Sequence, residues 1–361
     1  MWKTEEGSTG RLIQLCIGYF SFYVVTGISA KLFTDKHIAS SLHFNQIEYM
    51  VYNTIGGMLT ALGIVIVMRW YKLKSNQMIS VGGISIPEEV KYILPSGLMT
   101  AIVIPTTTLM YTFEGMSVMV AMVIMRASVI VISRAVDAVQ IGQGILKKRV
   151  YAEENYAVVF ALLAAGINLF YVQSGDFDFL NNSAAVIILS SYIVAYSIRI
   201  YIMNYFKNTR GKGIPLDNNG FFGIEQIFAF FFVVLISLFI YFSAPSLGWE
   251  VPQVTLFRES FYKSNTLWFL GVVSGTAFGL VAFFSVFLFM FKGRTATFAG
   301  LVNRLTSLTA GTVATLLSAI ILGAKFPKMQ DWISLAFILV AVWFLTVSER
   351  KRTAELKAEQ K

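Results

Sequence analysis

The stretch SVMVAMVIMRASVIVISRAVDA, residues 117–138, consists mostly of Val, Ile, Met and Ala, the side chains of a helix that contacts lipid. Arg126 nonetheless lies near its middle, and Arg134 and Asp137 follow. Placing a guanidinium at membrane depth costs about 2.5 kcal/mol or more, so an intramembrane arginine is a candidate for function. The stretch therefore predicts a membrane-spanning helix that carries part of a site.

The composition of the whole chain indicates an integral membrane protein. It has 361 residues, of which 56% are hydrophobic and 14% charged, whereas a soluble protein has about 25% charged residues. A helix needs about 20 apolar residues to cross the hydrocarbon layer, and open strands are excluded there because their backbone groups would stay unpaired. We therefore expect an all-α integral membrane protein with ten transmembrane helices. The expected spans are residues 12–33, 47–69, 91–113, 117–139, 156–173, 184–206, 221–243, 266–291, 296–322 and 330–348.

The connections between these spans predict the orientation. The side that holds both termini carries 19 Lys and Arg residues and the other side carries 5. Positive charge is enriched on cytoplasmic loops, so both termini are expected to be cytoplasmic, in a membrane that the sequence does not specify. The end of the chain, ERKRTAELKAEQK (residues 349–361), is expected to be a charged cytoplasmic tail with a frayed helix.

Ten spans divide into two sets of five, in residues 1–173 and 184–348. Because five is odd, the second set enters the membrane from the opposite side, as in transporters built from inverted repeats. Aligning residues 123–148 (VIMRASVIVISRAVDAVQIGQGILKK) with residues 301–326 (LVNRLTSLTAGTVATLLSAIILGAKF) matches Arg126 with Arg304. The sequence therefore predicts two inverted five-helix repeats around a central cavity.

Two motifs resemble the drug/metabolite transporter superfamily, in particular its nucleotide-sugar-transporter-like branch. They are VVTGISAKLFTD, residues 24–35, and LMYTFEGMSVMVAMVIMRASVIVISRA, residues 109–135. The resemblance implies a ten-helix transporter that works by alternating access. The chain departs from the family where GQGILKK and GAKFPKM lack the acidic residue that many members carry. The first span also lacks the glutamate of small proton-coupled multidrug exporters, which disfavours export of cationic drugs.

Charged residues inside the spans are the candidate binding residues. Five are basic and few are acidic, so a cavity that they face is net cationic. An arginine with aromatic and hydroxyl neighbours suits a phosphate, carboxylate or phosphorylated sugar. We expect Arg126 and Arg304 to be paired anion ligands on the pseudo-twofold axis. The other expected substrate-binding residues are Arg199, Lys31, Tyr192 and Tyr196.

Asp137 is the expected charge partner of an arginine. Arg134 lies three residues before it, so the two could pair directly along one helix face. In that arrangement they are either part of the site or only a clamp between helices. Similarly, Lys31 and Arg199 either bind substrate or extend their charged ends toward the membrane interface.

The expected function is that of a secondary transporter of an organic anion: a nucleotide sugar, a nucleotide, or another phosphorylated or carboxylated metabolite. Exchange is favoured, because an empty cationic cavity is costly to reorient. The alternatives are an exporter of amino acids, drugs or lipids with internally paired arginines, and a structural subunit of a larger membrane assembly.

An enzyme is not expected, because the spans hold no histidine and no nucleophile with a base at helical spacing. The expected partners are the organic anion and the lipid bilayer, with no nucleic acid, no metal and no cofactor. A homodimer or a larger assembly is left open. Gly271, Gly275 and Gly279 repeat every four residues, which predicts a close-packing helix face.

Overall fold

The computed structural model describes residues 4, 6–35, 38, 40–110, 118–171, 181–211 and 213–359. These residues fold almost entirely into helices. The elements are α1 (Thr9–Thr34), η1 (Ser40–Leu42), α2 (Gln46–Val67), β1 (Met78–Val81), β2 (Ile84–Pro87), α3 (Val90–Leu109), α4 (Val118–Gly142), α5 (Ala152–Gly166), η3 (Ile167–Tyr171), α6 (Ser183–Asn208), α7 (Asn218–Ser243), α8 (Pro252–Tyr262), α9 (Trp268–Phe289), α10 (Ala296–Leu322) and α11 (Met329–Glu359).

Nine helices in the described part of the chain are long and apolar enough to cross a membrane. They are α1, α2, α3, α5 with η3, α6, α7, α9, α10 and α11. The prediction of an all-α, multi-pass membrane protein agrees with this architecture. α4 has 25 residues and packs against α6 and α10 inside the same bundle.

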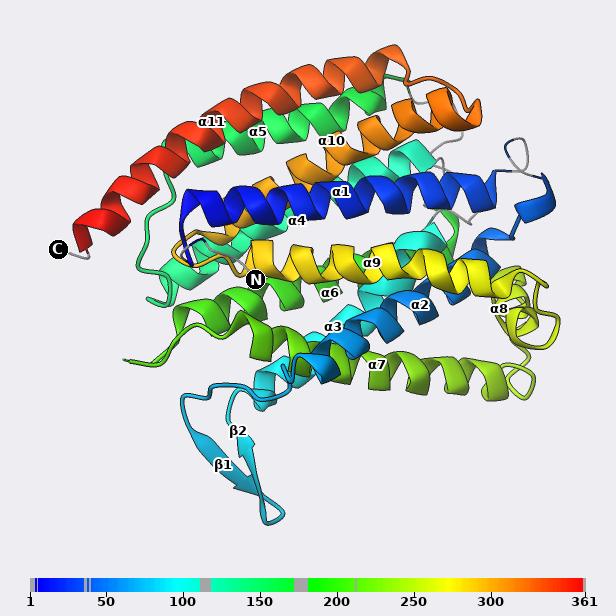
Figure 1. Cartoon of the computed structure of the whole chain (residues 1–361), viewed down its shortest axis with the longest axis horizontal. Coiled ribbons are helices and arrows are strands. Elements are labelled where there is room, and N and C mark those ends of the chain that lie inside the picture. The colour runs from blue at the N-terminus through cyan, green and yellow to red at the C-terminus, as the bar shows by residue number, and fades with distance from the viewer. Residues whose placement is uncertain are drawn as a thin grey trace.

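The two termini lie at the same end of the bundle, which we call the terminal end (Figure 1). The opposite end, called the far end, holds α8 and the connection between α10 and α11 (Figure 1). α1 and α10 start at the terminal end, whereas α4 and α6 start at the far end. A residue's position along its helix therefore gives its depth in the bundle.

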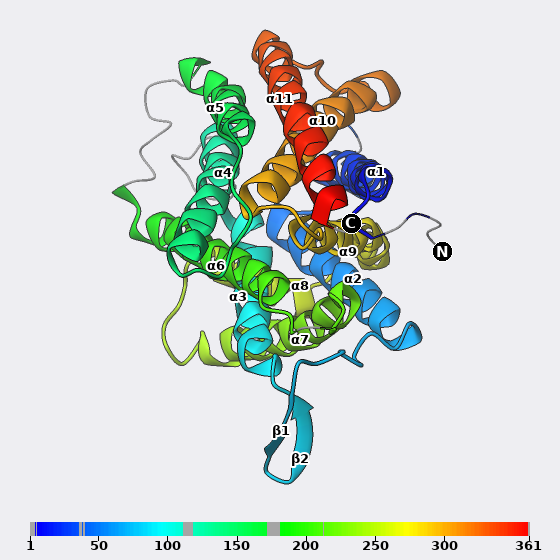
Figure 2. The ribbon, with the colours of Figure 1, turned by 90° about the vertical axis from the view of Figure 1, so that its left-hand side faces the viewer.

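Helices far apart in sequence form the main packing contacts. α2 lies along α9, α1 packs on both α9 and α10, and α3 packs on both α6 and α7. α5 lies along α11 at the periphery, and α10 lies near the middle when the bundle is viewed from the terminal end (Figure 2). The core therefore forms between the two halves of the chain.

Glycines bring α2 and α9 into backbone contact, as the spacing of Gly271, Gly275 and Gly279 predicted. A Cβ atom added to Gly275 would lie 2.2 Å from the Asn53 carbonyl oxygen, and one added to Gly56 would lie 1.8 Å from the Val272 carbonyl oxygen. Since no side chain fits in either place, the close approach depends on glycine.

The prediction for the end of the chain is wrong in part. α11 continues without a break to Glu359 instead of fraying after residue 348. Glu349 is 6% exposed and Arg352 is 2% exposed, so this segment is packed against the bundle. The sequence suggests a solvated tail because distant partners are not visible in it: Glu349 pairs with Arg294 in the α9–α10 connection, and Lys351 pairs with Glu153 on α5.

A short β-hairpin, β1 and β2, projects from the terminal end in the connection between α2 and α3 (Figure 1). Its base is fixed by Glu89, which accepts hydrogen bonds from the Asn76 N–H (2.6 Å) and the Ser75 hydroxyl (2.5 Å) and pairs with Arg210 (2.7 Å). Burial alone would raise the pKa of Glu89, but these bonds together hold that pKa below its usual range.

Candidate functional site

Arg304 is a buried cation in the middle of the bundle. It lies on α10 and is 8% exposed. Its Nε and Nη2 atoms have no hydrogen-bond partner among the described residues. A buried charge without a partner costs several kcal/mol, and native structures normally avoid it unless a ligand supplies the missing acceptor. The unpaired donors of Arg304 therefore mark a candidate anion site.

Aromatic rings form one wall of this site. The guanidinium of Arg304 lies over the Tyr196 ring, 5.1 Å from its centroid, and the Tyr196 ring contacts the Tyr192 ring at a centroid distance of 4.9 Å. The Tyr192 hydroxyl donates to the Met125 carbonyl oxygen at 3.3 Å, which links α6 to α4. The aromatic residues expected beside an arginine are thus present, but the arginine is Arg304 rather than their own helix neighbour Arg199.

Arg199 requires a correction. Its Nε and Nη2 donate to the two carboxylate oxygens of Glu225 at 3.0 and 2.9 Å, and the Ser96 hydroxyl donates to the same carboxylate at 2.6 Å. The Arg199 and Glu225 side chains are 7% and 0% exposed. In this structure Arg199 is buried and paired with Glu225, so it does not extend to the interface, and its role in substrate binding stays a prediction. The pair joins α6, α7 and α3.

The direct pairing of Arg134 with Asp137 also requires a correction. The Arg134 Nε donates to the Asn155 side-chain oxygen at 2.9 Å, toward α5. Asp137 instead binds the start of α10: its oxygens accept from the Ala296 N–H (2.8 Å), the Thr297 N–H (2.7 Å) and the Thr297 hydroxyl (2.6 Å). A helix N-terminus carries free N–H groups and partial positive charge, so it competes well for a carboxylate.

A polar cavity of about 280 Å³ lies near the far end. Two predicted residues, Lys31 and Arg126, line it together. The α10–α11 connection and the start of α11 add Lys325, Lys328 and Asp331. Among the described lining residues, positive charges outnumber negative ones. We call this cavity the far-end vestibule.

Arg126 lines the vestibule whereas Arg304 does not, so the pairing of the two arginines on one ligand stays a prediction. A Cβ atom added to Gly311 would lie 3.5 Å from Nη2 of Arg126, so that guanidinium sits beside Gly311 of α10. Arg304 lies seven residues earlier on the same helix, a rise of about 10 Å. Helical side chains lean toward their own N-termini, and α4 and α10 start at opposite ends of the bundle. From this tendency we expect the two guanidinium groups to point toward opposite ends of the bundle in this conformation.

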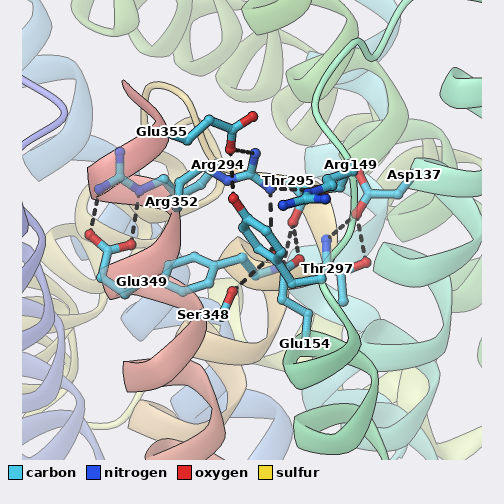
Figure 3. Close-up of polar contacts among 12 residues, drawn as sticks. Asp137, Arg149, Glu154, Arg294, Thr295, Thr297, Ser348, Glu349, Arg352 and Glu355 are labelled. Atoms are coloured by element: carbon cyan, nitrogen blue, oxygen red, sulfur yellow. Dashed lines mark hydrogen bonds and ion pairs between the residues drawn. The ribbon is translucent and has the colours of Figure 1, made fainter. Parts of the chain in front are cut away.

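Polar residues, most of them buried, form a network at the terminal end of the bundle (Figure 3). Besides Asp137, this terminal-end network contains Glu154 on α5. Glu154 accepts from the hydroxyl of Thr295 at 2.6 Å and from that of Ser348 at 3.0 Å. The Thr295 hydroxyl also accepts from the Phe298 N–H at 3.1 Å and so caps α10. One carboxylate thus connects α5, α10 and α11.

Two buried arginines complete the network (Figure 3). Arg294 binds both carboxylate oxygens of Glu349, with its Nε 3.0 Å from Oε2. Arg352 pairs with Glu355 at 2.7 Å and lies 4.6 Å from the centroid of the Tyr151 ring. Sequence reasoning missed these residues because they stand at span ends, where charges are normally solvated. The signal that the sequence offers for this network is Thr295, because a threonine directly before an apolar run is typical of a helix N-cap.

Comparisons with known proteins extend the description of the fold. No family model matches the chain, and no curated protein matches it. A solved structure described only as "Crystal structure of protein" matches 95% of this chain and 99% of its own length, with a TM-score of 0.53 and 12% sequence identity. At this identity the likeness concerns the fold alone. The fold and the site together define a helical membrane protein with a buried basic centre.

Proposed function

We propose that the protein is a secondary transporter that moves an organic anion by alternating access. The observation that carries the proposal is Arg304, a buried guanidinium with unpaired Nε and Nη2 donors above the Tyr196 ring. The site offers charge and two donors to a carboxylate or phosphate, and an aromatic face to an attached ring. Phosphorylated or carboxylated metabolites, including nucleotides and nucleotide sugars, are the substrate class.

The packing pattern supports two inverted five-helix repeats in a drug/metabolite-transporter-like arrangement. In that arrangement α6, α7, α9, α10 and α11 correspond to α1, α2, α3, α4 and α5. The contact of α1 with α9 then corresponds to that of α6 with α3, and the contact of α2 with α9 to that of α7 with α3. The contact of α1 with α10 corresponds to that of α6 with α4. Ten spans and a pseudo-twofold relation between the halves account for all three matches.

The two ends of the bundle differ in the way that alternating access requires. The far end contains the vestibule, whereas the terminal-end network joins α4, α5, α10 and α11 at the other end, which supports closure there. With both termini in the cytoplasm, as the distribution of Lys and Arg favours, this conformation faces away from the cytoplasm. Substrate would then enter through the vestibule and reach Arg304 near the middle.

The experiment is a thermal-stability screen of the purified chain against nucleotides, nucleotide sugars, phosphorylated metabolites, carboxylates, amino acids and cationic drugs. Anions are expected to stabilise the wild-type protein, and Arg304→Gln is expected to lose the response to anions that carry a ring, such as nucleotides, because these need both the guanidinium and the Tyr196 face. The variant alone should unfold at or above the wild-type temperature, because it removes an unpaired buried charge. Lys263→Gln is the matched control: Lys263 is exposed and pairs with Glu259 at 2.7 Å, away from the site.

Two results would overturn the proposal. If uncharged or cationic compounds stabilise the protein and anions do not, the chain is an exporter of another substrate class. If no compound acts and Arg304→Gln is strongly destabilised, Arg304 is structural and the protein is a scaffold within a larger assembly. Uptake into proteoliposomes, with and without internal anion, then distinguishes exchange from one-way transport.

A further inference from the structure

We propose that the far-end vestibule is a second anion-binding site, separate from Arg304, for a compact anion with at least two negative charges. The inference deepens the proposed function and rests on it only for the route of the substrate. The vestibule itself combines residues of α1, α4 and the α10–α11 connection. Lys325 and Lys328 come from that connection and were not among the residues predicted from the sequence.

The charge of the vestibule sets the charge of its ligand. Among the described residues that line the cavity, four are positively charged and Asp331 is negatively charged; Asp35 also lies close enough to act on Lys31. The positive residues are Lys31, Arg126, Lys325 and Lys328. The Asp331 carboxylate is already engaged, because its Oδ2 accepts from the Lys328 N–H at 2.8 Å at the start of α11. The positive charges of the described lining outnumber its negative charges, which favours a multiply charged anion over a monoanion.

Geometry separates this site from Arg304. The vestibule reaches Thr315 and Leu308 of α10, and Arg304 lies one turn beyond Leu308. Leu308 is 6% exposed and stands between the cavity and the buried guanidinium. The side chain of Arg304 leans away from the vestibule, toward the start of α10. One small anion cannot contact both sites at once.

The size of the cavity limits the ligand. A volume of about 280 Å³ lies just below the usual range for small-molecule pockets, which begins at about 300 Å³. It accommodates a phosphate, a pyrophosphate or a small phosphorylated or tricarboxylic metabolite. A whole nucleotide sugar exceeds it, so such a substrate would place only its diphosphate there.

Together these features describe a staged path: a multiply charged anion is first collected in the vestibule, and its charged group then passes Leu308 to Arg304. Electrostatic collection in a vestibule raises the rate of encounter and is weakened by salt. We therefore expect ionic strength to weaken anion binding at the vestibule more than anion binding at Arg304.

The test is calorimetric titration of the full-length protein in neutral detergent with inorganic pyrophosphate, at fixed ionic strength and with chloride as the monovalent comparison. The variants are Lys325→Gln/Lys328→Gln, Arg304→Gln and the control Lys263→Gln, which removes a far-end cation outside the vestibule. We expect the double variant to bind pyrophosphate about tenfold more weakly, from two partly exposed ion pairs. Arg304→Gln and Lys263→Gln should change this affinity by less than about twofold.

The outcomes separate the two proposals. Pyrophosphate binding that is lost in Arg304→Gln and unchanged in the double variant would overturn the second site. If Lys263→Gln weakens pyrophosphate binding as much as the double variant does, the binding reflects general surface charge, which also overturns the second site. Binding that depends on Lys325 and Lys328, in a protein that transports no anion, would support the vestibule site and refute the proposed function.

Discussion

Replacing Arg199 with Met should destabilise the protein strongly, because it leaves the Glu225 carboxylate charged and buried without its partner. The two side chains are 7% and 0% exposed and are joined by two hydrogen bonds of 3.0 and 2.9 Å. Removing one partner of such a pair costs about 3–5 kcal/mol. Ser96 donates only one further bond to the carboxylate, at 2.6 Å, which does not replace a cation.

A double-mutant cycle tests this expectation. Its second variant is Glu225→Gln, and its third variant combines both substitutions. The double variant should recover most of the loss, to within about 1–2 kcal/mol of the wild type, because it leaves neither charge alone. Unfolding by sodium dodecyl sulfate in mixed micelles, followed by circular dichroism, measures the free energy of unfolding of all four proteins. The ligand response of each is measured alongside.

One result would refute this reasoning. If Arg199→Met unfolds at the wild-type detergent concentration but no longer responds to anions, Arg199 contacts substrate and the Glu225 pair opens during transport. The original prediction of Arg199 as a binding residue would then hold. A full recovery of stability in the double variant, with the anion response retained, leaves Arg199 as a clamp between α6 and α7.

Three further predictions concern packing, the terminal end and pH. Gly275→Ala should cost about 3 kcal/mol or more in unfolding experiments, since its Cβ would lie 2.2 Å from the Asn53 oxygen, whereas Gly63→Ala, with no atom within 4 Å, should be neutral or stabilising. Asp137→Ala should cost about 2–3 kcal/mol and Asp137→Asn less, because the alanine leaves the N–H groups of Ala296 and Thr297 without their side-chain acceptor; equal losses would contradict this role. The hairpin base should loosen as pH falls: the pKa of Glu89 is held below its usual range, so its contribution is complete above the unfolded pKa of about 4.5 and is lost as pH falls through the lower folded value. Hydrogen exchange in β1 and β2 measures this, and Glu89→Gln should remove the pH dependence.

Part of the site could be found from residue type and spacing alone. Arg304 and Arg126 can be recognised in the sequence because an arginine inside an apolar run long enough to span a membrane is rare and usually marks a functional site. Tyr196 stands out for its aromatic ring at helical spacing. The vestibule residues Lys325 and Lys328 could not be found in this way, because lysines in a short connection are normally solvated.

The amino-acid sequence by itself determined the class of this protein: apolar runs long enough to cross a membrane must become helices, since lipid offers no partners for backbone groups. It also determined that the helix face around Gly275 packs closely against another helix. Only the tertiary structure decided which charges are free, because a pairing depends on where two helices cross. Glu225 neutralises Arg199 from α7, and the start of α10 takes Asp137. Neither contact follows from periodicity along one helix, so the tertiary structure alone shows Arg304 as a buried cation with unpaired donors.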